Sequence, residues 1–348
     1  MSLFTTPPDP RIARPTAPHR ATLAQRLAAA VTEPDRRVRD LLEAWFARLP
    51  GPAQADVRGR LWERDRRLAL AAFWELYLHE LLTRLGYRLV PHPAVPGAGA
   101  RPDFLATRDQ EAFYLEALIH GPSTEAWRAE RRLYPILDVL HEVQREPFVV
   151  TLAEATCGHG TPPLRVLRSE LVRWLDSLSP ATTDATLSWQ RGSWSLRFRA
   201  RRASSERADE QADPPSSPSL SLRTLLSKVQ AKARRYRVSD RPLLLALATS
   251  QAWPASTSQE LARRLARQLP DPAAGILLAA GLDPWTIAST PLVVAWRAEA
   301  VAPLHSFLSA LEEAGGRHLT PNVLLLDTPW RLFALWSTWP GDPLGGNE

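Results

Sequence analysis

The chain has 348 residues, 45% of them hydrophobic and 23% charged, so it is long enough to bury one large core or two smaller ones. Its single cysteine, Cys157, excludes an internal disulfide and a cysteine-rich zinc site. The formal net charge of +6 is compatible with a polyanionic partner, although composition alone favours an ordinary solvated surface.

Targeting signals and common catalytic motifs are absent from the sequence. The N-terminal segment has no apolar signal core, and no run of about 18 apolar residues occurs, so we expect a cytoplasmic protein with no membrane partner. The chain contains no Walker loop, GxGxxG, GxSxG or HExxH pattern, so nucleotide hydrolysis, serine hydrolysis and zincin chemistry are unsupported.

The first third of the chain predicts helices followed by strands. Residues 1–20 are rich in Pro and Arg and are expected to form a disordered arm. Residues 21–120 are expected to hold a helical segment and the first half of a core, with a long helix ending at Gly86. Three antiparallel strands should follow that helix, in the segments YRLVPHP, RPDFLAT and EAFYLEALI.

The rest of the chain also mixes helix and strand. Residues 121–202 are expected to form an α/β insertion with a hairpin turning at Arg191-Gly192, and residues 203–219 a disordered linker. Residues 220–340 should hold the second half of the core and a C-terminal α/β extension, followed by a tail at 341–348. The predicted fold class is α/β, a mixed sheet flanked by helices.

Three acids occupy positions where an acid is unexpected. Glu75 lies in an apolar, aromatic-rich helical segment, Asp103 follows Pro102 at the start of a strand, and Glu116 lies inside the strand FYLEALI. Two carboxylates from neighbouring strands and a third from a helix would suit Mg²⁺ or Mn²⁺, which could activate water. Taken singly, each acid is more simply explained by a structural role. Glu75 would lie on a solvent-facing stripe, and Glu116 would form an ion pair in an edge strand.

The order of these features resembles the PD-(D/E)XK nuclease superfamily, which has a restriction-endonuclease-like fold. The resemblance rests on FWELYLHELLTRLGYRL, RPDFLA and FYLEAL, with KVQAKARRY before RPLLLALAT, and it covers about residues 61–120 and 220–250. It implies a metal held by Asp103 and Glu116, aided by Glu75 and the carbonyl of Ala117. It also implies hydrolysis of phosphodiester bonds in nucleic acid, with DNA as the expected partner.

One position departs from the pattern of the superfamily. The lysine expected two residues after the second acid is replaced by Leu118, which can neither orient water nor stabilise charge. The next residue on that strand face is His120, a candidate substitute that is more often a plain strand-end residue.

All the lysines of the chain lie in one predicted helix. Lys228 and Lys232 are the only two, and residues four apart share a helix face. Some members of the superfamily supply the catalytic lysine from this following helix, so either residue is a candidate. An ammonium is a compact charge whose pKa shifts readily, whereas a guanidinium is a planar fork that stays protonated. The alternative is that both lysines cover a solvated face.

Nearby basic residues are candidates for contacts with nucleic acid. Arg234 and Arg235 could bind phosphate along the same groove, with Tyr236 one turn beyond Lys232. The tract RFRARRASSER could also contact a phosphate backbone, but beside a low-complexity segment we favour a solvated segment.

Two functions therefore remain open. The first is a metal-dependent nuclease in which Asp103, Glu116 and Glu75 hold Mg²⁺ or Mn²⁺ and Lys228 or Lys232 orients the attacking water. The second is a catalytically silent protein of the same fold that binds nucleic acid or another protein. The missing lysine at position 118 favours the second.

Overall fold

The computed structural model describes residues 1–4, 19–122, 124–179, 181–202, 222–286, 289–300 and 304–327, together with Pro329 and Phe333. The predicted linker at 203–219 and the predicted tail at 341–348 lie outside these residues. The chain divides into two compact units. The core unit comprises Met1–Pro15, Thr22–Gly121 and Leu220–Glu348, and the insert unit comprises Thr16–Ala21 and Pro122–Ser219.

The core unit is built on a mixed sheet, which confirms the predicted α/β class. The first three strands are antiparallel, as predicted, and the next two run parallel to the third. Spatial order along the eight-stranded sheet is β1 (Arg88–Pro91), β2 (Phe104–Arg108), β3 (Glu111–His120), β7 (Leu243–Thr249), β8 (Ala273–Ala280), β9 (Leu292–Trp296), β11 (Val323–Leu326) and β10 (Arg317–Thr320).

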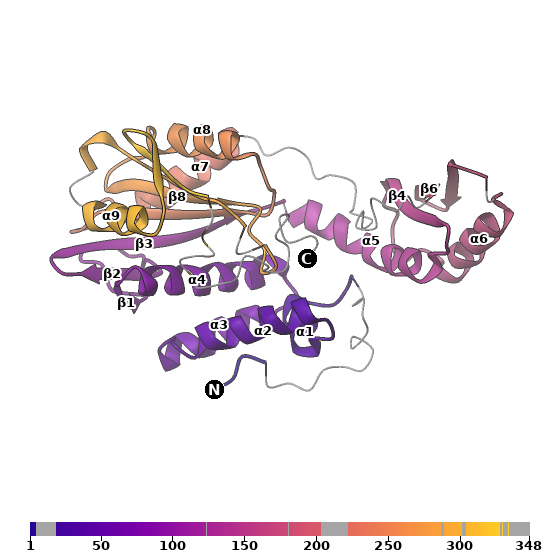
Figure 1. Ribbon diagram of the computed structural model, residues 1–348, viewed down its shortest axis with the longest axis horizontal. Coiled ribbons are helices and arrows are strands. Elements are labelled where there is room, and N and C mark those ends of the chain that lie inside the picture. Colours follow the sequence, from indigo (N-terminus) through magenta and orange to yellow (C-terminus); the bar gives the residue numbers. More distant parts are fainter. Residues whose placement is uncertain are drawn as a thin grey trace. The chain divides into compact units, whose positions relative to one another are not determined.

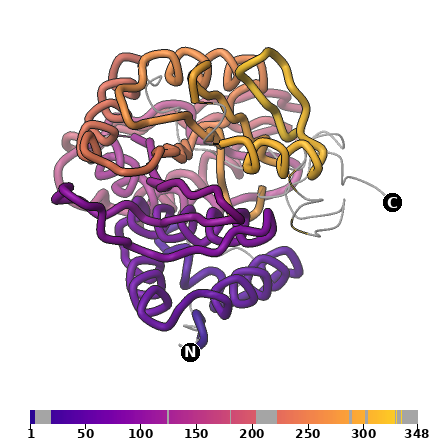
Figure 2. The backbone as a smooth tube through the Cα atoms, turned by 90° about the vertical axis from the view of Figure 1, so that its left-hand side faces the viewer, coloured from indigo at the N-terminus to yellow at the C-terminus, as the bar shows by residue number. Residues whose placement is uncertain are grey.

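Helices cover both faces of this sheet, which explains why its central strands are continuous apolar runs (Figures 1 and 2). On one face α4 (Arg66–Arg84) and α9 (His305–Glu313) pack on the sheet, and α1 (Leu23–Ala29), α2 (Glu33–Phe46) and α3 (Gly51–Leu61) pack on α4. The other face packs against α7 (Leu222–Ala233), α8 (Ala255–Ala266) and the 3-10 turn η1 (Arg234–Tyr236). A second 3-10 turn, η2, spans Ala298–Ala300.

The structure corrects the prediction of a disordered arm at 1–20 for its first four residues. Leu3 is fully buried in the core. The backbone N–H groups of Leu3 and Phe4 donate to the Glu43 carboxylate at 3.0 and 2.8 Å, and the Ser2 hydroxyl donates to it at 2.5 Å. A buried apolar side chain and a satisfied backbone anchor this end of the chain. Residues 5–18 lie outside the described residues.

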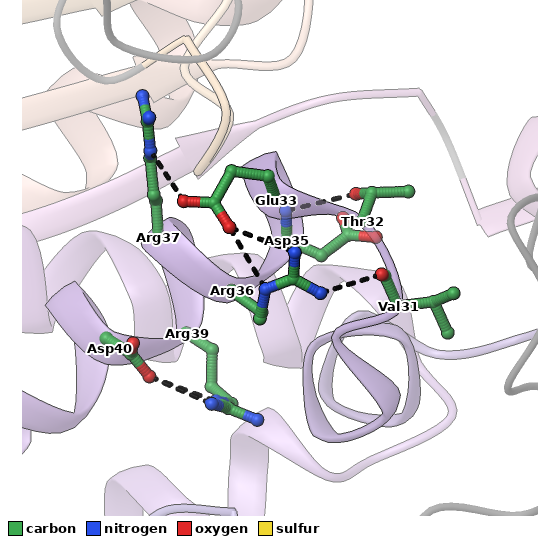
Figure 3. Close-up of polar contacts among 8 residues, drawn as sticks. All are labelled: Val31, Thr32, Glu33, Asp35, Arg36, Arg37, Arg39 and Asp40. Atoms are coloured by element: carbon green, nitrogen blue, oxygen red, sulfur yellow. Dashed lines mark hydrogen bonds and ion pairs between the residues drawn. The ribbon is translucent and has the colours of Figure 1, made fainter.

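The arginine-rich helix α2 begins with local charge pairing (Figure 3). The Thr32 hydroxyl accepts a hydrogen bond from the backbone N–H of Asp35, the usual way to satisfy a free donor at a helix start. Glu33 accepts from Arg36 and Arg37 at 3.0 and 3.1 Å. These arginines are thus occupied on the helix surface, while the apolar face of α2 packs into the core.

Apart from Thr16–Ala21, the insert unit lies in sequence between β3 and α7. Its sheet is antiparallel in the order β4 (Phe148–Thr156), β6 (Trp194–Arg202), β5 (Asp184–Arg191), and its helices are α5 (Thr124–Val143) and α6 (Leu164–Ser177). The predicted hairpin is confirmed, since Arg191 pairs with Trp194 across the turn. The insertion therefore interrupts the crossover from β3 through α7 to the parallel strand β7. None of the described helices has the length and apolarity needed to cross a membrane.

Candidate active site

Two of the predicted acids lie side by side on the sheet of the core unit. Asp103 directly precedes β2, and β2 pairs with β3 so that Phe104 faces Leu115, which brings Asp103 next to Glu116. Phe104 and Leu115 point into the cluster that contains α4, so strand alternation directs Asp103 and Glu116 to the face covered by α7. The backbone N–H of Ala117 donates to the Asp103 carboxylate at 2.7 Å.

Glu116 is buried and receives two partners from the segment that follows the insert unit. Its side chain is 2% exposed. The Tyr236 hydroxyl donates to one carboxylate oxygen at 2.6 Å, and the Lys232 ammonium forms an ion pair with the other. Burying a carboxylate is costly unless it is paired and hydrogen-bonded, and these two donors meet that requirement. Of the two predicted lysines, Lys232 is the one that reaches the acids.

Asp103 has a strongly altered protonation equilibrium. Burial, followed by the charges of Glu116 and Glu75, raises the pKa of Asp103 to about 8. The hydrogen bond from Ala117 and the charge of Lys232 oppose this rise but do not cancel it. At neutral pH Asp103 is therefore mainly protonated, because two adjacent carboxylates with one ammonium cannot both ionise cheaply.

Glu75 is close enough to influence Asp103 but is engaged elsewhere. Arg60 of α3 donates to both Glu75 oxygens, at 2.6 and 2.5 Å. Glu75 lies on α4, which covers the opposite face of the sheet from α7 (Figure 1). Among the residues that the structure describes, no three or more His, Cys, Asp and Glu side chains are grouped to hold a metal ion. The predicted three-acid set is therefore not assembled, and two acids remain.

Lys228 and His120 lie away from the two acids. Lys228 is exposed, and it differs in this respect from Lys232. His120 is 3% exposed, and burial together with the charge of Lys228 lowers the pKa of His120 to about 4. The neutral imidazole has no hydrogen-bond partner at Nδ1 among the residues that the structure describes. Leu118, between His120 and Glu116 on the same strand face, packs against the cluster of α7 and α8.

Tyr236 corrects the predicted set of nucleic-acid contacts. It is 1% exposed, and its hydroxyl is committed to Glu116, so it cannot present its ring to a ligand. Burial and the bond to Glu116 raise the pKa of Tyr236, which keeps the hydroxyl protonated as a donor. Arg234 and Arg235 are exposed, and their contact with phosphate stays a prediction.

Two functional contacts were missed by sequence reasoning. The hydrogen bond between Tyr236 and Glu116 had a weak signal in the sequence, because Tyr236 lies one helical turn beyond the candidate Lys232. The pairing of Arg60 with Glu75 had none, because it depends on how α3 crosses α4. In comparisons with known proteins, no family model, no curated protein and no solved structure matches this chain.

Proposed function

We propose that the protein is a metal-dependent nuclease of the PD-(D/E)XK type that hydrolyses phosphodiester bonds in DNA. The observation that carries the proposal is a buried Glu116 held between Lys232 and Tyr236, beside an Asp103 whose pKa is raised to about 8. Strongly shifted carboxyl groups with a specific charge partner are typical of functional sites. The order α4, β1, β2, β3, α7, β7 is also the order that the sequence resemblance implies.

The donor chemistry of the site fits a hard divalent cation. Asp103 and Glu116 are oxygen donors of the kind Mg²⁺ and Mn²⁺ prefer, and one of them carries a proton that a cation could replace. When bound, the metal would supply electrostatic neutralisation of the phosphate. Glu75, held by Arg60, is proposed to stabilise the fold and to shape the potential at Asp103.

Lys232 is proposed to orient the attacking water. Tyr236 fixes one oxygen of Glu116, so the carboxylate cannot rotate freely and its second oxygen holds the ammonium at the site. A lysine ammonium can release a carboxylate oxygen and donate a hydrogen bond to a water oxygen instead. Its N–H donors rotate freely, whereas those of an arginine guanidinium are fixed in one plane. This geometry gives a chemical reason why lysine, and not arginine, occupies position 232 in a chain with 43 basic residues.

The second candidate is a catalytically silent protein that binds nucleic acid. It is favoured by Leu118 and by the lack of a three-acid metal group among the described residues. It predicts salt-sensitive binding of DNA that is indifferent to Mg²⁺ and is not followed by cleavage.

Cleavage of labelled DNA and RNA substrates with Mg²⁺ or Mn²⁺ tests the proposal. We expect cleavage of DNA that falls at least about 100-fold in Glu116→Gln and in Lys232→Ala, the scale seen when one preorganised charge or donor is removed. Arg223→Ala is the matched control, because it removes the same charge from an exposed position of α7 nine residues away, on the opposite side of the helix.

The control variant is expected to retain cleavage within about threefold of the parent, because exposed surface charges act weakly at a distance. Metal-dependent cleavage that survives both Glu116→Gln and Lys232→Ala would contradict the proposal and indicate a contaminating nuclease. Binding of DNA without any cleavage would establish the silent alternative.

A further inference from the structure

The insert unit presents a sheet face that no described helix of the unit covers. Along its central strand β6, buried apolar residues alternate with arginines. Trp194, Leu196, Phe198 and Ala200 belong to the core of the unit, into which α5 and α6 also pack. The intervening arginines must therefore project from the opposite face, because successive strand residues point to opposite sides.

These arginines form a straight row on the outward face. Arg197, Arg199 and Arg201 follow one another at every second position of β6, about 7 Å apart. Hydroxyl residues lie beside them in register: Thr186 and Ser188 on β5 pair with Arg199 and Arg197. The sequence interpretation favoured a solvated segment for this tract, whereas the strand Trp194–Arg202 places three of its charges on one side.

Two arginines of the row form ion pairs on the same surface. Arg197 donates to Glu154 of β4 at 2.7 Å, and Arg199 donates to Asp184 of β5 from Nε at 2.8 and 3.0 Å. The side chains of Arg197 and Glu154 are 50% and 64% exposed, so water screens the attraction strongly. Arg201 lies opposite Asp184 in the ladder, and three guanidinium groups therefore face two carboxylates.

We propose that this arginine face binds the sugar–phosphate backbone of a nucleic acid. Regularly spaced guanidinium groups suit a ligand with regularly spaced anions, and each can form two hydrogen bonds to one phosphate. The neighbouring hydroxyls are further donors to phosphate oxygens. A row of arginines flanked by hydroxyls is typical of a nucleic-acid interface, which is more polar and more positively charged than a protein–protein interface.

The inference goes beyond the proposed cleavage, because it assigns a binding surface on a different unit from the two acids. The carboxylates of Glu154 and Asp184 then have a definite role. They occupy Arg197 and Arg199 until a phosphate displaces them, which weakens binding and makes it reversible. Removing them should therefore strengthen the binding of nucleic acid.

Fluorescence anisotropy with labelled single-stranded and duplex DNA, and with matching RNA, tests the arginine face. The full chain is used with EDTA, so that binding is measured without cleavage. Replacing Arg197, Arg199 and Arg201 together by Gln should weaken binding at least about tenfold at low salt. The slope of log Kd against log salt should fall by about 2 to 3, since each lost phosphate contact contributes about 0.7 to 0.9. The probe that loses most affinity identifies the preferred strand state.

A matched triple variant separates a specific surface from general electrostatics. Arg165, Arg168 and Arg173 are exposed on α6, which packs on the apolar face of the same sheet, and their replacement by Gln removes the same charge. This control should retain affinity within about threefold. Equal losses in the two triple variants, or no loss in either, would overturn the inference.

The reverse substitutions guard against a variant that simply fails to fold. Glu154→Gln combined with Asp184→Asn should tighten binding by about threefold or more, an outcome that an unfolded protein cannot give. Unchanged or weaker binding by this folded double variant would count against the arginine face. A full-length parent protein that binds nucleic acid through the arginine face but never cleaves it refutes the proposed nuclease and leaves this inference standing.

Discussion

At the scale of single residues, the fold stabilises the two acids of the candidate site, Asp103 and Glu116, in different ways. Glu116 is neutralised by the ammonium of Lys232 and hydrogen-bonded by Tyr236. Asp103 has one backbone donor, from Ala117, and retains a proton to about pH 8. The pair therefore carries close to one negative charge at neutral pH, matched by one ammonium, which is a low-energy arrangement for two adjacent acids.

The raised pKa of Asp103 predicts how stability depends on pH. The folded-state pKa of about 8 lies above the ordinary value of 3.8, so Asp103 contributes full stability below about pH 4 and loses it as pH rises to about 8. Asp103→Asn mimics the protonated acid and removes this dependence. Between pH 5 and 7 the unfolding free energy of the parent, relative to the variant, should fall by up to about 1.4 kcal/mol per pH unit.

Denaturant unfolding of both proteins across this pH range, in EDTA, provides the measurement. Comparing parent and variant cancels the titration of the histidines, which both proteins share. A difference that stays flat, or that grows in the opposite direction, would show that Asp103 is ionised at neutral pH in the folded protein.

The sequence predicted part of the site at this scale and missed the rest for physical reasons. The bias against lysine pointed to Lys228 and Lys232, and the second does contact Glu116. The prediction that Tyr236 is free to contact a ligand was wrong, because Tyr236 is buried. Long-range packing decides which face of the turn Arg234–Tyr236 is buried, and the local sequence does not show it. The partner of Glu75 was unpredictable because Arg60 lies on another helix.

At the scale of elements, an ion pair joins α3 to α4. Arg60 is bonded to Glu75 and to Asp56, and the side chain of Glu75 is 11% exposed. Arg60→Ala should destabilise the protein by about 3 to 5 kcal/mol, because it leaves the Glu75 carboxylate buried without its partner. Urea unfolding followed by circular dichroism measures this change.

A double variant shows whether the ion pair itself is needed. Arg60→Met combined with Glu75→Leu should recover most of the lost stability, since apolar residues of similar volume often replace a buried pair at little cost. If the single variant is as stable as the parent, then solvent reaches Glu75 and the pairing is incidental.

Most elements with a local sequence signal were predicted, and some elements in the C-terminal third were not. The three antiparallel strands and the hairpin at Arg191-Gly192 were found because alternation and turn residues are local signals. The short helix His305–Glu313 and the strand Arg317–Thr320 were missed. The strand is largely exposed, so it carries no periodic apolar signal, although it forms a tight hairpin with Val323–Leu326.

At the scale of the whole molecule, the insert unit interrupts a simple crossover. β3 and β7 are parallel neighbours, and α7 is the helix that connects them apart from the insertion. Replacing residues 122–219 by a short Gly/Ser linker should therefore leave the core unit folded, with a cooperative thermal transition. Loss of cooperative unfolding in the shortened chain would show that the core depends on the insertion.

The place of the insertion also governs when the acids acquire their partners during synthesis. Glu116 leaves the ribosome more than a hundred residues before Lys232 and Tyr236, and the insert unit emerges in between. A domain that emerges early can fold while the remainder is still being translated. A nascent or prematurely ended chain that stops before position 232 thus lacks the Lys232 ammonium, and the site can assemble only after Lys232 and Tyr236 have been synthesised.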